Sequence, residues 1–280
     1  KGLYASPSRA LLGDRYADHR GRALGIYSAG TDLGGLAAAG LAVLVLATPG
    51  WRAAFLPVLV VLGLTALLFV AWNRESYALH RVAFSPRRTA DRVLATRKQR
   101  ELLVAFSLFY FAVGGVINFY PTLLVRARGI DPGLASASFA LLFLVGLFVK
   151  PSAGAASDRV PRLLVAIGGL VLASGGLALV LLGPGLPAVV AGTVLAALGY
   201  KVQFPIADAV VIEAAPDAEV GGDLGAARGV YLGANALGPG VVGLVAQVGS
   251  YPLAFWLLAA ALLAAAGVLA IQYRRGTAAA

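Results

Sequence analysis

The chain has 280 residues, of which 59% are hydrophobic and only 13% are charged. Ordinary soluble domains carry about 25% charged residues, so this composition excludes a typical soluble enzyme or regulatory domain. The sequence has no cysteine, which excludes disulfides and thiolate metal ligands. Its two histidines lie among charged residues without the H-E-x-x-H spacing of a zinc site. We therefore expect neither a metal nor another cofactor.

The apolar residues are grouped in blocks of about 20, the length of helix that crosses a hydrocarbon core of about 30 Å. Because a single apolar segment in lipid must satisfy its backbone hydrogen bonds internally, these blocks predict transmembrane helices. The fold class is therefore an all-α polytopic transmembrane helix bundle. Nine spans are predicted, the first of them incomplete: 2–12, 23–47, 53–71, 102–125, 134–149, 163–182, 186–211, 226–248 and 253–271.

Lysine and arginine are concentrated in alternate connections between the predicted spans. The largest group lies from Arg74 to Arg100, and others lie at 15–22, at 159–162 and in the carboxyl-terminal tail. Since cationic loops stay on the cytoplasmic side of a membrane, these connections are predicted to be cytoplasmic. Topology and attraction to the lipid bilayer account for the net charge of +10, so nucleic acid is not an expected partner.

Two stretches about 200 residues apart are alike, and such internal repeats are common in transporters. Gly25-Ile-Tyr27 recurs as Gly229-Val-Tyr231, and Ala54-Phe55 recurs as Ala254-Phe255. The repeat predicts two related halves. The second half has six predicted spans and the first has only three, so we expect three further helices to precede Lys1 in the complete protein.

The connection Gly154-Ala-Ala-Ser-Asp158-Arg159-Val-Pro-Arg162 has the spacing G-x-x-x-D-R-x-x-R. With the repeat and the basic linker, this loop resembles the major facilitator superfamily, whose members have two six-helix halves joined by a basic cytoplasmic loop. The resemblance implies twelve spans in a multi-pass protein, expected in a prokaryotic plasma membrane. It divides the chain into the remainder of the amino-terminal half at 1–73, a linker at 74–101 and the carboxyl-terminal half at 102–280.

The expected role of the G-x-x-x-D-R-x-x-R loop is that of a conformational latch. Gly154 lets two helix ends approach, and Asp158 can pair with arginines such as Arg159 and Arg162 or with a helix amino terminus. Such a contact breaks when the two halves rock. A plain tight turn is the alternative. The family's antiporter motif is present only in part, because Thr31 replaces its proline, so antiport is not established.

Ionisable residues inside a predicted span are functional candidates, because a charge at membrane depth costs at least a few kcal/mol. Lys201 lies within the span 186–211, close to Gln203 and two turns before Asp208, while Lys1 lies at nearly the corresponding level of the first helix. Two cations facing one cavity would suit a carboxylate or phosphate substrate. The alternatives are a cut chain end at Lys1 and a Lys201 that reaches the interface or pairs with Asp208.

Asp32 lies within the span 23–47 and could carry a coupled proton, with Asp208 as the second candidate for this role. A hydrogen-bonded structural acid is the alternative. Other polar side chains, several of them at repeat-related positions, could hydrogen-bond a solute at the junction of the halves: Tyr27, Thr31, Tyr231, Asn235 and Asn118.

The sequence contains no G-x-x-x-x-G-K-[ST] loop, so ATP is not an expected partner. It also shows no arrangement of nucleophile, base and orienting residue, so we do not expect an enzyme. We expect a monomeric secondary transporter that moves a small-molecule substrate by alternating access, driven by a proton or solute gradient. An anionic substrate and drug efflux are both compatible with this reading. The alternative is a transporter-like membrane sensor or assembly protein that does not transport.

Overall fold

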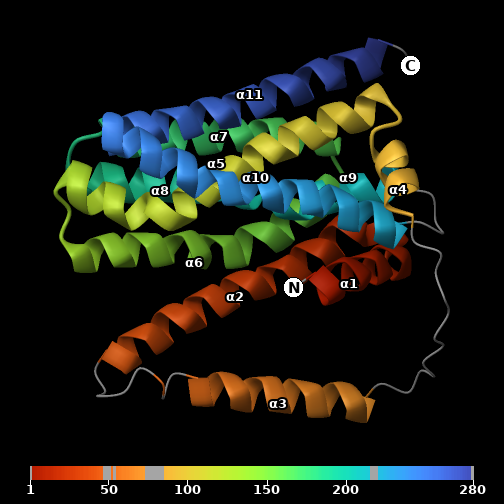
Figure 1. Ribbon diagram of the computed structural model, residues 1–280, viewed down its shortest axis with the longest axis horizontal. Coiled ribbons are helices and arrows are strands. Elements are labelled where there is room, and N and C mark those ends of the chain that lie inside the picture. The colour runs from red at the N-terminus through yellow and green to blue at the C-terminus, as the bar shows by residue number, and fades with distance from the viewer. Residues whose placement is uncertain (1, 47–51, 53–54, 73–84, 215–219, 279–280) are drawn as a thin grey trace.

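The computed structural model describes residues 2–46, 52, 55–72, 85–214 and 220–278, and every regular element among them is a helix. The long helices run roughly along one direction (Figure 1), which confirms the predicted all-α bundle. The elements are α1 (Gly2–Arg15), η1 (Ala17–His19), α2 (Arg20–Leu46), α3 (Phe55–Trp72), α4 (Pro86–Val93), α5 (Arg97–Arg128), α6 (Pro132–Ser157), α7 (Arg162–Leu182), α8 (Gly185–Lys201), α9 (Gln203–Ala214), α10 (Val220–Val248) and α11 (Tyr251–Ala278).

Seven segments of the described chain are long and apolar enough to cross a membrane, compared with the nine spans predicted. The first predicted span corresponds to α1, whose 14 residues reach only about 21 Å at 1.5 Å per residue. The second corresponds to α2, which has 27 residues, but several side chains near its carboxyl end lie outside the described set. The count of nine is therefore slightly too high by this measure, while the fold class stands.

The carboxyl-terminal helices build the main apolar core. α7 packs along α8, and both α10 and α11 pack on α5. Small residues make the first of these contacts close, because a side chain at Gly176 or Gly199 would overlap the backbone of the neighbouring helix. Large buried side chains such as Phe106, Phe109 and Phe255 fill the space between the other helices. This half therefore forms a packed frame against which the first helices lie.

α2 joins the first part of the chain to this frame by packing along α6. A side chain on Gly21 would overlap the carbonyl oxygen of Gly154, and a side chain on Gly25 would overlap the carbonyl oxygen of Lys150. The two backbones therefore touch along this stretch, because glycine is the one residue that permits the approach. The contact brings Lys150 on α6 directly against α2.

The predicted span 186–211 is divided into α8 and α9 at Val202. The physical cause is Pro205, which has no backbone N–H to donate and whose ring crowds the carbonyl four residues earlier, that of Lys201. Val202 nevertheless keeps helical backbone angles, φ −56° and ψ −34°, and Gly185–Glu213 has the length and composition of one span, so the predicted span is confirmed.

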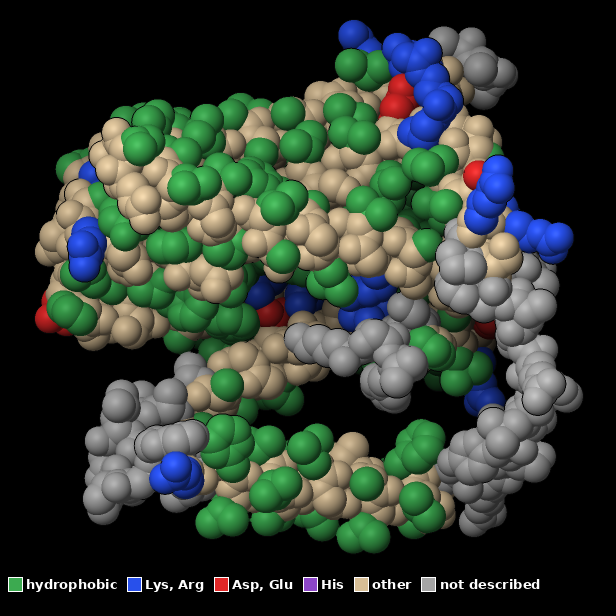
Figure 2. Space-filling view, in the orientation of Figure 1, with side chains coloured by type: hydrophobic (Ala, Val, Ile, Leu, Met, Phe, Trp, Pro, Cys, Tyr) green, Lys and Arg blue, Asp and Glu red, His purple; other side chains and the backbone are tan. Residues whose placement is uncertain are grey.

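The linker predicted at 74–101 contains a short helix, α4, and its residues 74–84 lie outside the described set. α4 packs on α10, where Arg92 Nη2 lies 2.8 Å from Asp223 Oδ1. Figure 2 shows many Lys and Arg side chains at the end of the molecule where α4 and the carboxyl terminus lie. This distribution agrees with a cytoplasmic location for that end.

We predict that Gly25→Ala lowers the free energy of unfolding by about 1–3 kcal/mol, because its methyl group would push α2 away from the Lys150 carbonyl. Thermal unfolding of the protein in detergent measures the change. Gly30→Ala is the matched control on the same helix, since a side chain there meets nothing within 4 Å. Equal melting temperatures for the two variants would contradict the backbone contact between α2 and α6.

Candidate substrate-binding site

Asp32, Lys150 and Lys201 form a buried ionic cluster contributed by α2, α6 and α8. Lys150 Nζ lies 2.7 Å from Asp32 Oδ2, and Lys201 Nζ is hydrogen-bonded to Asp32 Oδ1. The three residues are only 2–3% exposed. Moving a charge out of water costs several kcal/mol unless it is paired, so each ammonium group depends on the shared carboxylate. We call these three residues the Asp32 cluster.

α2 and α6 supply the groups that orient Lys150. Its Nζ donates hydrogen bonds to the carbonyl oxygen of Ser28, at 2.9 Å, and to Thr31 Oγ1, at 2.8 Å. Gly146, one turn before Lys150 on α6, leaves the space in which Asp32 and Lys201 meet, since its Cβ would lie 2.6 Å from Asp32 Oδ2. The local sequence Gly146-Leu-Phe-Val-Lys150 therefore provides both the cation and the room for its partners.

Aromatic rings surround the two ammonium groups. Lys201 Nζ lies 4.6 Å from the ring centroid of Phe143 and 4.9 Å from that of Tyr200, and Lys150 Nζ lies 4.7 Å from that of Phe204. The negative face of an aromatic ring attracts a cation, and it does so more strongly where water is excluded. The rings thus help to keep two cations in the interior of a membrane protein.

A second buried cluster has the same design around Asp208 of α9. Arg9 Nε of α1 lies 2.7 Å from Asp208 Oδ2, and Arg228 Nη1 of α10 lies 2.7 Å from Asp208 Oδ1. The Arg9 guanidinium also lies 4.9 Å from the ring centroid of Tyr27, whose hydroxyl is hydrogen-bonded to Ser8 Oγ at 2.8 Å. In both clusters one carboxylate bridges two cations on different helices.

The two clusters contain four cations and two carboxylates, which leaves a net charge of +2 when all six groups are ionised. Figure 2 shows basic and acidic side chains in the recess between α2 and the helices above it. Buried positive charge of this kind favours the entry of an anion, because the anion supplies the missing negative charge. An arrangement with this charge can bind a carboxylate or a phosphate.

Two of the predicted ionisable residues, Asp32 and Lys201, are thus in direct contact, and Thr31 touches the same cluster through Lys150. Asp208 belongs to the second cluster, so the alternative in which Lys201 pairs with Asp208 is wrong. The two carboxylate oxygens of Asp208 are bound by Arg9 and Arg228 instead.

Gln203 and Asn118 make hydrogen bonds that hold helices rather than contacts to either cluster. Gln203 Nε2 donates to the carbonyl oxygen of Ala166 on α7, at 2.9 Å, and Asn118 Nδ2 donates to the carbonyl oxygen of Gly114 on its own helix, at 2.8 Å. The side-chain amide N–H groups of both residues thus bind backbone oxygens. Lys1, which was also predicted to contact substrate, lies outside the described residues.

Tyr231 and Asn235 of α10 both face α5. The rings of Tyr231 and Tyr110 are stacked with centroids 5.3 Å apart and an angle of 5° between their planes. Asn235 Nδ2 donates to the carbonyl oxygen of Tyr110 at 3.0 Å. The repeat-related residues Tyr27 and Thr31 contact the charged clusters through Arg9 and Lys150, so the two members of the repeat have different surroundings in this structure.

Sequence reasoning missed three of the buried cations. Lys150 follows the apolar run 141–149 and precedes a proline, which placed it at the end of a predicted span instead of inside α6. Arg9 lies in the middle of α1, between Ser8 and Ala10, and a cation inside a predicted span is a signal that could have identified it. Arg228 falls near the start of the predicted span 226–248 and was not singled out, while in the structure α10 begins at Val220 and carries Arg228 more than two turns inside the helix.

The G-x-x-x-D-R-x-x-R loop joins α6 to the amino terminus of α2. Asp158 Oδ1 accepts a hydrogen bond from the backbone N–H of Gly21, at 2.8 Å, and Asp158 Oδ2 accepts one from that of Arg22, at 3.0 Å. Arg162 Nη2 lies 3.4 Å from Asp158 Oδ1, while Arg159 is exposed. A carboxylate here satisfies two free N–H groups and faces the positive end of the helix dipole.

The sequence matches a known family of membrane proteins. The family model of the Major Facilitator Superfamily matches residues 1–183 and 102–279, which together span nearly the whole chain. The chain therefore belongs to the Major Facilitator Superfamily, a family of membrane transporters. No curated protein matches the sequence.

Solved structures show the same fold. The crystal structure of the human organic anion transporter MFSD10 (TETRAN) has a TM-score of 0.77 at 19% identity, covering 94% of this chain and 67% of that one. The E. coli fucose:proton symporter FucP has a TM-score of 0.60 at 14% identity, covering 78% of this chain and 55% of that one. The chain thus spans little more than half the length of FucP. At such identities the likeness concerns the fold alone.

We predict that Asp32→Asn lowers the free energy of unfolding by about 3 kcal/mol, because it leaves two buried ammonium groups without their shared anion. Lys150→Met and Lys201→Met should each cost less, since one Lys–Asp pair remains in either variant. Thermal unfolding in detergent measures all three. Asp91→Asn, at an exposed position of α4, is the control and should change stability by less than about 0.5 kcal/mol. A smaller loss for Asp32→Asn than for the lysine variants would contradict the shared ion pair.

Proposed function

We propose that this chain is the larger part of a secondary transporter that carries a small organic anion across the membrane by alternating access. The observation that carries the proposal is the excess of buried positive charge at Lys150 and Lys201, which share the single carboxylate of Asp32. A bound substrate carboxylate would balance the charge, because the two lysine ammonium groups would then face two carboxylates, that of Asp32 and that of the substrate. The fold likeness to an organic anion transporter is consistent with this substrate class.

Alternating access needs a contact between the two halves that can open. In this structure the cytoplasmic ends of α2 and α6 are joined by Asp158, and their glycine-lined backbones touch below it. Rocking the halves apart at this end would break these contacts, so the loop acts as the latch of the cytoplasmic gate. The Asp32 cluster bridges the same pair of helices deeper in the bundle, so substrate binding there can influence the gate.

Asp32 is also the group best placed to couple transport to protons. It is the acid shared by both lysines, and its protonation would remove the negative charge that competes with a substrate anion for them. Proton binding and anion binding at one cluster would therefore support each other. This is the coupling reaction that we propose for the protein.

We predict that Lys150→Met and Lys201→Met each reduce carboxylate counterflow at least tenfold, because each removes one buried positive charge from the binding site. Asp32→Asn should retain counterflow, since exchange needs no net proton movement, but should lose the acceleration of uptake by a pH gradient. Proteoliposomes containing the full-length protein and labelled carboxylates, with phosphate as a second anion, measure both properties.

The matched control for these lysines is Lys98→Met, at an exposed position in the first turn of α5, which should exchange anions like the unchanged protein. Normal counterflow in both cluster variants would overturn the proposed anion site. Binding of carboxylates without any exchange would instead favour a sensor that shares the transporter fold.

We predict that Asp158→Asn opens the cytoplasmic end more often, because a neutral amide oxygen accepts the two N–H bonds of α2 less strongly than a carboxylate. A cysteine introduced at Ser157, which is buried in the closed end, should react with a soluble maleimide several times faster in this background. Asp131 caps the opposite end of α6, so the variant Asp131→Asn serves as the control and should leave the labelling rate unchanged. Equal labelling rates would contradict the latch.

A further inference from the structure

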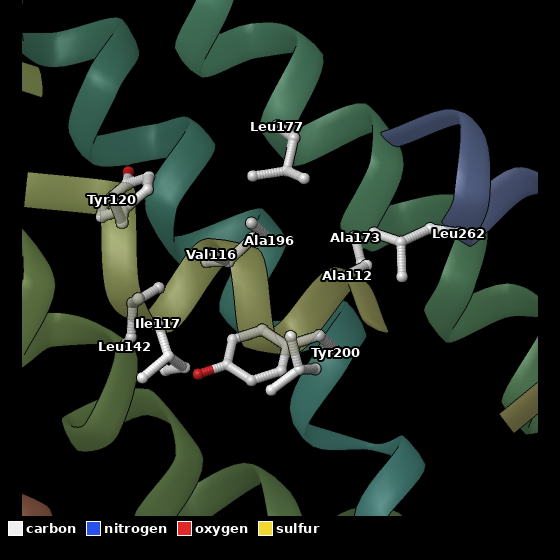
Figure 3. Close-up of a pocket in the computed structure, with 11 residues that line it drawn as sticks. Ala112, Val116, Ile117, Tyr120, Leu142, Ala173, Leu177, Ala196, Tyr200 and Leu262 are labelled. Carbon is white, nitrogen blue, oxygen red and sulfur yellow. The ribbon is translucent and has the colours of Figure 1, made fainter. Parts of the chain in front are cut away.

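The carboxyl-terminal half has a recess at its surface that is far larger than the space in its interior. The interior space, which Figure 3 shows between α5, α6, α7, α8 and α11, has a volume of about 20 Å³, enough for one water molecule. The surface recess has a volume of about 360 Å³ and lies where α5 and α7 begin and α11 ends. Volumes above about 300 Å³ are typical of small-molecule sites.

Three cations and one carboxylate line this recess, which we call the Glu101 recess. Arg97 and Lys98 come from the first turn of α5, and Arg275 comes from the last turn of α11. Glu101 Oε1 lies 2.8 Å from Arg97 Nε and 2.7 Å from Arg275 Nη1. One carboxylate is thus shared by two arginines on different helices, and the lining has a net charge of +2 when all four groups are ionised.

The cations of the Glu101 recess are accessible, in contrast with those of the Asp32 cluster. The side chains of Arg97 and Arg275 are 69% and 51% exposed. Figure 2 shows basic side chains around an acidic one at the end of the molecule where Figure 1 places the carboxyl terminus. Arginine binds a phosphate through two parallel N–H bonds, so an exposed pair of arginines suits a phosphate group.

Gln272 connects the two helices that carry these charges. Its Nε2 donates to the carbonyl oxygen of Lys98 at 3.5 Å, and the residue is buried. Leu163 and Tyr273 add apolar surface to the lining. Because α5 and α11 are both long and apolar enough to cross a membrane, their ends lie near the membrane surface. Tyrosine is common at that level, where its ring contacts lipid and its hydroxyl contacts water.

Exposed apolar side chains continue from the recess along the same two helices. Val104 follows Glu101 by three residues on α5, and Ile271 precedes Arg275 by four residues on α11, so each lies on the same helix face as its charged neighbour. Val104 and Ile271 are each about half exposed. Cations at the end of two spans, with apolar side chains one turn deeper, match the order of headgroup and acyl chains in a phospholipid.

We propose that the Glu101 recess binds the headgroup phosphate of an anionic phospholipid in the cytoplasmic leaflet, with the acyl chains along Val104 and Ile271. The three cations hold the phosphate, and Glu101 keeps the two arginines in position. Basic pockets between helix ends on the cytoplasmic side bind anionic headgroups in other membrane proteins. No residue of the Asp32 cluster lines this recess, so the lipid site is separate from the proposed substrate site.

The test titrates the full-length protein in detergent with phosphatidylglycerol, or with phosphatidylcholine that has the same acyl chains, and measures the first binding event by native mass spectrometry. Phosphatidylglycerol should bind at least tenfold more tightly, because its net negative charge is attracted by the recess while phosphatidylcholine is neutral overall. Glycerol 3-phosphate, which has the phosphate without the chains, should bind at least tenfold more weakly than phosphatidylglycerol.

Two variants should change the affinity for phosphatidylglycerol in opposite directions. Arg275→Gln should lower it about fivefold, which is the usual effect of one cation near an anionic lipid surface. Glu101→Gln should raise it by a similar factor, because it removes the carboxylate that competes for the arginines, and a merely structural role of Glu101 predicts no such gain. Arg100→Gln is the matched control, since Arg100 is exposed in the same part of α5 and does not line the recess.

Each outcome decides the proposal. Equal affinities for the two phospholipids, equal effects of Arg275→Gln and Arg100→Gln, or weaker binding in Glu101→Gln would overturn it. Glycerol 3-phosphate that binds as tightly as phosphatidylglycerol would overturn the lipid and indicate a site for a soluble phosphate. Failure of this proposal would leave the proposed transport function intact, because the two sites share no residue.

Discussion

The arrangement of the described helices depends on one carboxylate shared by two buried lysines. Asp32 of α2 is held by Lys150 of α6 and Lys201 of α8, so three helices meet at a single charge. Such a cluster is expensive to bury, and its partners keep it only because aromatic rings and backbone oxygens surround the cations. Removing one member of such a cluster leaves a buried charge unpaired, so the three side chains depend on one another, and anion binding is the role that we propose for them.

The same two helices carry the second constraint, the close contact of their backbones. Gly21 and Gly25 let α2 touch α6, and Asp158 at the end of α6 satisfies the first N–H groups of α2. Glycine contacts can slide apart without a loss of side-chain packing, and a cap of two hydrogen bonds is weak enough to open. The contact thus holds α2 against α6 by a close backbone approach and two hydrogen bonds to Asp158.

The sequence by itself determined the all-α membrane fold and the family, because apolar length and the G-x-x-x-D-R-x-x-R spacing are local properties of the chain. It also identified Asp32 and Lys201, since a charge within an apolar run is visible without a structure. Only the tertiary structure decided their partners. Lys150 lies 118 residues from Asp32 along the chain, and Asp208 pairs with Arg9 and Arg228 instead of with Lys201. Pairing between distant helices depends on close packing in three dimensions, which a one-dimensional pattern of charges cannot specify.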